Sequence, residues 1–367
     1  MEKRSFLFDA LVWGGVKNER LLRRTNQTDM DKFNIVLSPD NNYAKHAAVV
    51  MASVLGNCEN PENVAFHILE DGSLSQENRE KLAFVVKSGA EIFFERIDMH
   101  GMAELPESGY LTVNMWYRLC IASALPQNIE RALYLDCDTV VNAPLSEIFN
   151  IDMRGKTVAG AMDCWWKKFD KRIGFPKGYR YFNSGVLLID MERWRGLGIE
   201  KKLFDFLSEN PEKARLLDQT VLNIVLQNEY LNLPMAYNFQ YVPPFFEESC
   251  YLRDASEYVD TLPAPKIVHF VGMYKPWNLG LGVCNIYHLL YFRHLAQTPF
   301  AFASKAEEAA FLAASRRAKF GAVAKMMWRK FRRQPWFFFK PFCIQRIILE
   351  LYAAAHKKDV KFTSTTK

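Results

Sequence analysis

The sequence predicts an α/β protein with a mostly parallel central sheet that is covered by helices. Apolar runs of strand length, at 33–38, 64–69 and 92–97, alternate with segments whose apolar residues recur at helical spacing. This alternation is typical of βαβ units, in which a helix returns the chain to a parallel strand. A further run at 132–135 has no polar position, as in a strand that is buried on both faces.

The first part of the chain is expected to fold in simple alternation after an irregular lead-in at residues 1–32. In order, the expected elements are a strand at 33–38, a helix at 44–57, a strand at 64–69, a helix at 75–88, a strand at 92–97, a helix at 115–124 and a strand at 132–135. No Gly-x-Gly-x-x-Gly motif follows the first strand, so the dinucleotide-binding version of this architecture is excluded.

The second half continues the same pattern. We expect strands at 158–162, 186–190 and 267–270, and helices at 198–209 and 221–227, the last opened by residues 216–220. Gly185 stands just before the 186–190 strand. Because glycine has no Cβ, it would let the backbone pass close to a ligand there.

Two acids, Asp136 and Asp138, follow the apolar 132–135 run with one residue between them. Burying an unpaired charge inside a strand costs several kcal/mol or more, so we expect both at the carboxyl end of the strand. Open α/β sheets bind ligands at that end. Two hard oxygen donors there suit a divalent cation that bridges to a diphosphate. The alternative is two acids in a loop that are satisfied by nearby backbone N–H groups.

Other polar residues also stand where an apolar strand stops. Asp40 follows the first strand, Asp163 follows the 158–162 strand, and His269 lies in the 267–270 strand. The carboxyl ends of parallel strands meet at one edge of a sheet, so we expect these residues to converge on Asp136 and Asp138. Their types are those of a site for a metal and a diphosphate.

Composition narrows the class of protein. The apolar fraction is 49%, ample for a packed core, and the net charge is +6. The seven cysteines are scattered with no Cys-x-x-Cys pair, so we expect neither a zinc cluster nor a disulfide framework, and a reducing cytoplasm is favoured. Asp9 interrupts the apolar start, and no signal peptide is expected. The sequence has no run of about twenty uncharged apolar residues, so no membrane-spanning helix is expected.

Several short motifs together resemble one enzyme family. They are Asp40-Asn41-Asn42-Tyr43-Ala44, Tyr117-Arg118-Leu119, Leu133-Tyr134-Leu135-Asp136-Cys137-Asp138, Phe182-Asn183-Ser184-Gly185-Val186, Asp218-Gln219 and His269-Phe270-Val271-Gly272-Met273-Tyr274-Lys275-Pro276-Trp277. With them the chain resembles glycosyltransferase family 8, a retaining group with the GT-A nucleotide-diphospho-sugar transferase fold. It is most similar to the bacterial lipopolysaccharide galactosyl- and glucosyltransferases of that family. The resemblance runs from about residue 33 to 294.

The resemblance implies a metal site. Asp136, Asp138 and His269 would hold Mn²⁺, or Mg²⁺, bound to the two phosphates of a UDP-sugar. Mixed oxygen and imidazole donors suit Mn²⁺ better. Lys275 would reach a phosphate oxygen as a point charge, and Gly272 would let main-chain N–H groups approach the diphosphate. The alternatives are a satisfied core histidine for His269 and an ordinary surface lysine for Lys275.

The resemblance also implies a set of donor-binding residues. Asp40, Asn42 and Tyr43 would contact the uridine, and Cys137 would belong to the donor site; the alternative for the first three is an ordinary turn. The residues expected to surround the donor sugar are Arg118, Asp163, Asn183, Asp218 and Gln219, of which Asp163, Asp218 and Gln219 are the catalytic candidates. Arg118 could instead make a structural ion pair, and Asp218 could be a helix N-cap.

The implied reaction is transfer of a hexose, galactose or glucose, from a UDP-sugar to the hydroxyl of a saccharide acceptor in lipopolysaccharide or other cell-surface glycan synthesis. A retaining glycosidase uses a carboxylate nucleophile. Gln219 is the matching residue nearest the sugar face, and an amide is a poor nucleophile, so front-face attack by the acceptor is the better hypothesis. The rivals are a sugar nucleotidyltransferase, whose usual Gly-rich triphosphate loop is absent, and a non-catalytic basic adaptor for membranes or nucleic acid.

The C-terminal part changes character at Arg316. Between Arg316 and Arg346 no acid occurs, and basic residues interleave with aromatic ones such as Trp328 and Trp336. This composition favours an anionic membrane surface, with nucleic acid or a helix packed on the catalytic domain as alternatives. We therefore expect a lead-in at 1–32, a catalytic domain at 33–295 and a basic, aromatic, helical extension at 296–367. The protein would be cytoplasmic, peripheral on the inner face of the plasma membrane, acting on a lipid-linked acceptor and not on nucleic acid.

Overall fold

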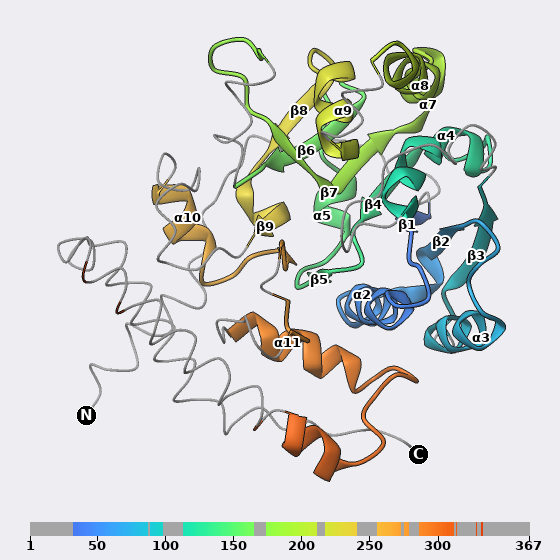
Figure 1. The fold of residues 1–367 in the computed structure, drawn as a ribbon, viewed down its shortest axis with the longest axis vertical. Helices are drawn as coiled ribbons and strands as arrows, with labels where there is room; N and C mark the ends of the chain where they lie inside the picture. The colour runs from blue at the N-terminus through green and yellow to red at the C-terminus, as the bar shows by residue number, and fades with distance from the viewer. Residues whose placement is uncertain are drawn as a thin grey trace.

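The structure, a computed structural model, confirms the α/β architecture. It describes residues 32–86, 89–97, 113–164, 174–210, 217–240, 255–272, 275–278 and 286–311, together with residues 313, 328 and 332. Within this part of the chain, one large sheet and one small sheet are surrounded by helices (Figure 1). The lead-in at 1–32, except Lys32, and nearly all of the 316–346 segment lie outside the described residues.

The large sheet has seven strands in the order β3-β2-β1-β4-β7-β6-β8. Their bounds are β1 Phe33–Leu37, β2 Val64–Glu70, β3 Glu91–Arg96, β4 Arg131–Leu135, β6 Val158–Met162, β7 Phe182–Asp190 and β8 Tyr230–Leu233. The first four in this order are mutually parallel, whereas β7 is antiparallel to both β4 and β6. The prediction of a mostly parallel sheet is confirmed. The reversed direction of β7 places the start of that strand at the edge where β1, β4 and β6 end.

A small three-stranded sheet, in the order β5-β10-β9, lies beside the large one. It contains β5 Thr139–Val141, β9 Phe239–Gln240 and β10 Ile267–His269. The chain leaves β4 at Asp136 and enters β5 at Thr139, so residues 139–141 form a separate strand and do not prolong β4. β10 pairs antiparallel with β5, and His269 lies opposite Thr139. This pairing brings His269 to the acids, although it does not belong to the parallel sheet on which the expectation of convergence was based.

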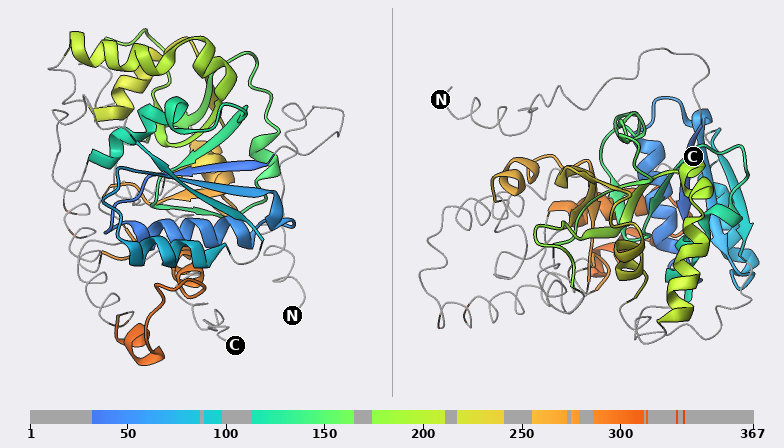
Figure 2. Two further views of the ribbon diagram at one scale, coloured as in Figure 1. Left: turned by 90° about the vertical axis from the view of Figure 1, so that its right-hand side faces the viewer. Right: turned by 90° about the horizontal axis from the view of Figure 1, so that it is seen from above.

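Helices cover both faces of the large sheet (Figure 2). The longer ones are α2 Ala44–Gly56, α3 Gln76–Val85, α8 Ile199–Glu209, α9 Leu217–Val225 and α11 Ile286–Leu295, and the short ones are α4 Ile121–Ala124, α5 Ser146–Phe149, α7 Met191–Gly196 and α10 Ala255–Thr261. Three 3-10 segments complete the described part: η1 Pro61–Asn63, η2 Val113–Cys120 and η5 Met235–Asn238. The predicted helix at 115–124 is therefore mostly 3-10, with an α-helical end.

Alternate residues of the central strands feed two separate cores. Ile35 and Leu133 pack in the cluster that contains α2. Val36 and Tyr134 face the other way, into the cluster that contains η2, α8 and α9. Successive side chains of a strand point to opposite faces, so a sheet buried on both sides needs apolar residues at every position. The continuous apolar runs of the sequence have this cause.

Residues beyond α11 continue to pack on the rest of the molecule. Phe302 and Phe311 contact Phe292 of α11, with ring centroids 6.4 and 5.5 Å from it. The division at residue 295 stays a prediction. Among the described residues, no helix combines the length and apolarity needed to cross a bilayer.

Candidate active site

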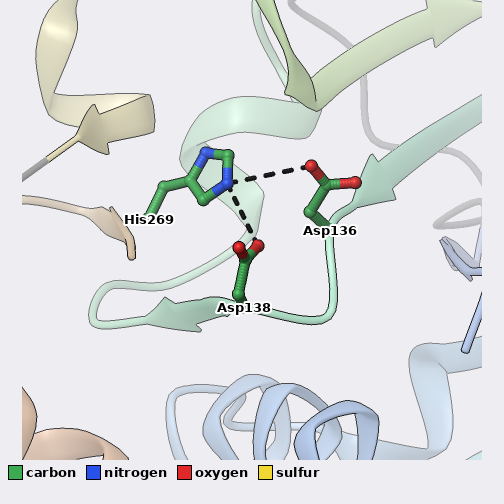
Figure 3. Close-up of side chains that lie close together, drawn as sticks. All are labelled: Asp136, Asp138 and His269. Carbon is green, nitrogen blue, oxygen red and sulfur yellow. Dashed lines mark ion pairs between the residues drawn. The ribbon is translucent and has the colours of Figure 1, made fainter. Parts of the chain in front are cut away.

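Two carboxylates and one imidazole meet at the junction of the two sheets. Asp136 follows β4, Asp138 precedes β5 and His269 ends β10. Figure 3 shows the imidazole pointing at both acids: His269 Nε2 lies 3.0 Å from Asp138 Oδ1 and 3.7 Å from Asp136 Oδ2. One donor atom from each residue lies within 4.8 Å of the others. The convergence predicted for these residues is confirmed. This is the only such three-residue group of potential metal ligands in the described part of the chain.

Gly185 makes room for this trio. A Cβ at residue 185 would lie 2.3 Å from His269 Cε1 and 2.6 Å from Asp136 Oδ2. The Gly185 carbonyl also accepts a 2.8 Å hydrogen bond from the Asp136 N–H. The approach of a ligand to Gly185 stays a prediction, and the groups that lie against it in the structure are side chains of the protein.

Lys275 places a positive charge beside the trio of Asp136, Asp138 and His269. Its ammonium forms an ion pair with Asp138 Oδ2, and the lysine is only 6% exposed, so it is not the ordinary surface lysine of the alternative interpretation. Burial raises the pKa of Asp138, but the charge of Lys275 outweighs it and holds that pKa well below its usual range. Gly272, in the same loop, has a φ of 63°, a left-handed conformation that glycine adopts easily.

Arg118 forms ion pairs with Asp136 of the trio and with Asp218 of α9. Its Nη2 lies 2.9 Å from Asp136 Oδ1, and its Nε lies 2.8 Å from Asp218 Oδ2. It also donates a 2.8 Å hydrogen bond to the Ser184 carbonyl and stacks over the Tyr134 ring. Burial raises the pKa of Asp218, and Arg118 opposes this shift. Asp218 lies within the first turn of α9, so it is not the N-cap that was considered as an alternative.

Asp163, Asn183 and Gln219 form one hydrogen-bonded cluster beside the trio. Asn183 Nδ2 donates to Asp163 Oδ2 at 2.9 Å and to Gln219 Oε1 at 3.1 Å. Gln219 Nε2 donates to the same Asp163 oxygen at 3.1 Å, and its Oε1 accepts from the Ser184 N–H at 3.0 Å. The end of β6, the start of β7 and the first turn of α9 therefore bring together three of the residues that the family resemblance assigned to the donor sugar.

The predicted uridine-binding turn sits at the start of α2. Asp40 Oδ1 accepts a 2.7 Å hydrogen bond from the Tyr43 N–H. This carboxylate therefore stabilises the turn, as the alternative interpretation of an ordinary turn requires. Asn42 is exposed, and Tyr43 is half-buried. The Cys137 side chain packs in the core with α2, so only the backbone of this residue could contact a UDP-sugar.

An aromatic cluster fixes the loop that carries Lys275. The Trp277 ring stacks on His46 of α2 at a centroid distance of 3.6 Å, and Tyr43 meets Trp277 edge-on at 6.2 Å. His46 Nδ1 lies 2.6 Å from the hydroxyl of Tyr291 in α11. The loop is thus held between two helices, and Trp277 links it to Tyr43.

Comparison with known proteins identifies the family. The model of the glycosyl transferase family 8 matches residues 34–279. The chain belongs to glycosyltransferase family 8. It is 30% identical to general stress protein A of Bacillus subtilis over 72% of this chain and 93% of that protein. It is also 30% identical to a lipopolysaccharide 1,3-galactosyltransferase of Salmonella typhimurium over 68% of this chain and 74% of the relative.

Solved structures agree on the fold. The galactosyltransferase LgtC, solved in complex with donor and acceptor sugar analogues, superimposes with a TM-score of 0.56 at 25% identity, covering 67% of this chain and 89% of that one. The bifunctional glycosyltransferase WbbM gives a TM-score of 0.61 at 19% identity over 75% of this chain and 51% of its own. The predicted GT-A fold of this family 8 glycosyltransferase is confirmed.

Three residues that contact the predicted site residues were not themselves predicted, although one of them, Tyr134, stands inside a motif of the family. Tyr134 donates a 3.1 Å hydrogen bond to Asp136 Oδ1 from within an apolar strand. His46 lies among the apolar residues of α2, and Asn238 bonds His269 from the 3-10 segment η5. Only the arrangement of distant segments reveals them, so a single sequence could not.

The buried His46 makes a prediction about acid stability. Burial lowers the pKa of His46 from 6.5 to about 3, and the charge of Lys45 adds to this shift. The unfolded chain therefore binds a proton that the folded protein excludes, and stability falls as pH decreases from 6.5 toward 3, by at most about 1.4 kcal/mol per pH unit from this residue. His46→Phe should flatten the dependence of the unfolding free energy on pH, measured by urea denaturation from pH 7 to 4.

Tyr291→Phe is the matched control for this experiment. It removes the same 2.6 Å hydrogen bond but leaves His46 buried, so the slope with pH should stay close to that of the unmodified protein. An unchanged slope in His46→Phe would contradict the prediction.

Proposed function

We propose that this family 8 enzyme transfers a hexose, galactose or glucose, from a UDP-sugar to a hydroxyl of a saccharide acceptor with retention of the α configuration. The observation that carries the proposal is the convergence of Asp136, Asp138 and His269 on one point. The names of relatives add support: a lipopolysaccharide 1,3-galactosyltransferase and a lipopolysaccharide 1,2-glucosyltransferase are each 30% identical to this chain. Lipopolysaccharide synthesis is the corresponding role.

The donor atoms of the trio fit a divalent cation. Asp138 Oδ1 is buried and lies 3.0 Å from His269 Nε2. Two neighbouring ligands of an octahedral ion at about 2.1 Å are themselves about 3.0 Å apart. Two carboxylates with one imidazole favour Mn²⁺ over Mg²⁺, which prefers oxygen alone. When bound, such a cation stabilises the negative charge that develops on the departing UDP.

Each of the remaining residues has a proposed part. Lys275, held at Asp138, would pair with a negatively charged diphosphate oxygen, and Gly272 would expose main-chain N–H groups to the diphosphate. Tyr43 would stack on the uracil, with Asp40 and Asn42 bonding its edge and the ribose. The residues assigned to the sugar are Arg118, Asp163, Asn183, Asp218 and Gln219, because their polar groups match sugar hydroxyls.

Front-face attack by the acceptor is the proposed route. The Gln219 amide is engaged at both ends, by the Ser184 N–H at Oε1 and by Asp163 at Nε2, in addition to being a weak nucleophile. Asp163 accepts two hydrogen bonds at its Oδ2, which lowers its tendency to attack carbon. Both residues are therefore better suited to hold the sugar and stabilise its positive charge. The leaving phosphate oxygen would take the acceptor proton.

The test is release of UDP from a panel of UDP-hexoses with Mn²⁺ in the assay. We expect metal-dependent hydrolysis of one or both of UDP-galactose and UDP-glucose, abolished by a chelator. A sugar nucleotidyltransferase would release pyrophosphate instead, and a non-catalytic adaptor would release nothing. A stable sugar adduct on Gln219 or Asp163 of the native enzyme, found by mass spectrometry, would defeat the front-face route.

Membrane contact through residues 316–346 is a separate part of the proposal. The basic and aromatic composition supports it, as does Trp328, which is 62% exposed. Replacing Arg329, Arg332 and Arg333 with Gln in the full chain should weaken sedimentation with phosphatidylglycerol vesicles about 10-fold or more, at about 1 kcal/mol for each charge, and leave UDP release unchanged. Equal sedimentation of the substituted and unsubstituted chains, or equal binding to neutral vesicles, would contradict an electrostatic membrane contact.

A further inference from the structure

Asn238 connects the two halves of the site. It ends η5 immediately before β9 and is fully buried. On one side its Oδ1 lies 3.0 Å from His269 Nδ1, and on the other its Nδ2 lies 2.9 Å from Asn183 Oδ1. It thus stands between the imidazole of the trio and the cluster of Asp163, Asn183 and Gln219.

The orientation of each amide in this chain follows from a backbone group. The Gly185 N–H can only donate, and it lies 3.0 Å from Asn183 Oδ1, so that atom must be the oxygen. The Asn238 atom that reaches the same oxygen must then be its NH₂ group, which leaves Asn238 Oδ1 facing His269. A carbonyl oxygen accepts and cannot donate, so the proton of the neutral imidazole lies on Nδ1.

The position of that proton determines what His269 offers to the acids. With Nδ1–H donated to Asn238, Nε2 carries a lone pair that points toward Asp138 Oδ1 at 3.0 Å and Asp136 Oδ2 at 3.7 Å. Three lone pairs then face one point, an arrangement that is repulsive alone and favourable around a cation. The other tautomer would place a proton there and exclude a metal from that position.

The far end of the chain reaches the proposed sugar-binding residues. Because Asn183 Oδ1 faces Asn238 and Gly185, Asn183 Nδ2 is the group that donates to Asp163 and Gln219. Asn238 therefore bonds His269 with its oxygen and Asn183, whose own oxygen is oriented by the Gly185 N–H, with its NH₂ group.

We propose that Asn238 is a positioning residue that fixes the metal-binding tautomer of His269 and couples it to the orientation of Asn183, and through Asn183 to Asp163 and Gln219. The inference rests on the proposed metal-dependent function only in assigning a divalent cation to the trio. The tautomer follows from the protein alone and can be measured without metal.

The first test compares two substitutions by Mn²⁺ titration, with free Mn²⁺ followed by electron paramagnetic resonance in the presence of UDP. Asn238→Ala removes both bonds and should weaken Mn²⁺ binding about 10- to 100-fold, the usual cost of losing a partner of a ligating histidine. Asn238→Asp keeps an acceptor for His269 Nδ1–H but cannot donate to Asn183. It should bind Mn²⁺ within about threefold of the unmodified protein yet lower kcat for hexose transfer about 10-fold or more.

Asn223→Ala is the matched control. Asn223 is equally buried and also bonds the start of β7, through the Phe182 N–H at 2.9 Å, but has no contact with His269. Its loss should lower the melting temperature and leave the Kd for Mn²⁺ unchanged. An Asn238→Ala protein that binds Mn²⁺ as tightly as the unmodified enzyme would overturn the proposal, as would an Asn238→Asp protein that binds it 10-fold less tightly.

The second test reads the tautomer directly in metal-free protein. Long-range ¹H–¹⁵N correlation spectra distinguish the two neutral forms, and His269→Asn identifies the signal among the seven histidines. We expect Nδ1–H in the unmodified enzyme and in Asn238→Asp, and a shift toward Nε2–H in Asn238→Ala. Nε2–H in the unmodified enzyme would overturn the proposal. Absence of UDP release, with the expected tautomer and Mn²⁺ affinities in place, would instead count against the proposed function.

Discussion

Asp138→Asn is expected to reduce Mn²⁺-dependent UDP release by about 1,000-fold or more, since a ligand carboxylate that supports several kcal/mol of charge stabilisation is lost. Oδ1 of this residue faces His269 Nε2 and Oδ2 pairs with Lys275, so one substitution removes charge from both contacts. The uncharged amide also places an N–H or a weaker oxygen where a cation would bind. Initial rates of UDP release and Mn²⁺ titration measure the effect.

Two controls keep this result from being confused with unfolding. Lys275 is buried and loses its partner in Asp138→Asn, so thermal denaturation must accompany the assay. Asp205→Asn removes a carboxylate from a surface pair with Lys201 in α8 and should alter neither rate nor melting temperature appreciably. A folded Asp138→Asn enzyme with more than about one tenth of normal activity would exclude a role for Asp138 in holding a catalytic cation.

Gly185→Ala is expected to lower activity by about 100-fold or more, because a displacement of about 1 Å in a catalytic group has that cost. The new methyl carbon would stand 2.3 Å from His269 Cε1 and 2.6 Å from Asp136 Oδ2, so at least one of these side chains must move. The loss should occur in Mn²⁺ affinity as well as in kcat. Titration with Mn²⁺ and rates at saturating metal separate these two effects.

Gly196→Ala provides the comparison for the added methyl group. A Cβ at Gly196, the last residue of α7, would meet nothing within 4 Å, so this change should leave activity as it is and stability unchanged or slightly raised. A Gly185→Ala enzyme with normal Mn²⁺ affinity would show that the trio tolerates the displacement and is not a precise ligand set.

The strands and the polar residues at their ends could be predicted from sequence for a local reason. A strand buried on both faces needs apolar residues throughout, so a charge marks where the strand stops. Asp136 and Asp163 were found in this way, one after β4 and one after β6. Gln219 and Arg118 were reached only through a family resemblance, since nothing in helical periodicity distinguishes them.

The remaining parts of the site depend on pairing between distant segments. No local feature of the sequence indicates that β7 is antiparallel to its neighbours, or that β5 lies outside the large sheet and pairs with β10. His269 was expected at the edge of a parallel sheet and reaches the same place through this second sheet. Asn238 has an ordinary loop sequence, and only its two partners, 31 and 55 residues away, give it a role.

Because the link between β4 and β5 is short, metal binding would affect the stability of the fold. Asp136 closes a strand of one sheet and Asp138 precedes a strand of the other, with a single residue between them. Sliding one sheet against the other would pull the ligands apart. A bound ion would therefore act as a cross-link between the sheets and would add about 2.7 kcal/mol to the unfolding free energy at a concentration of 100 Kd. Heat resistance of the whole domain should accordingly rise with metal concentration.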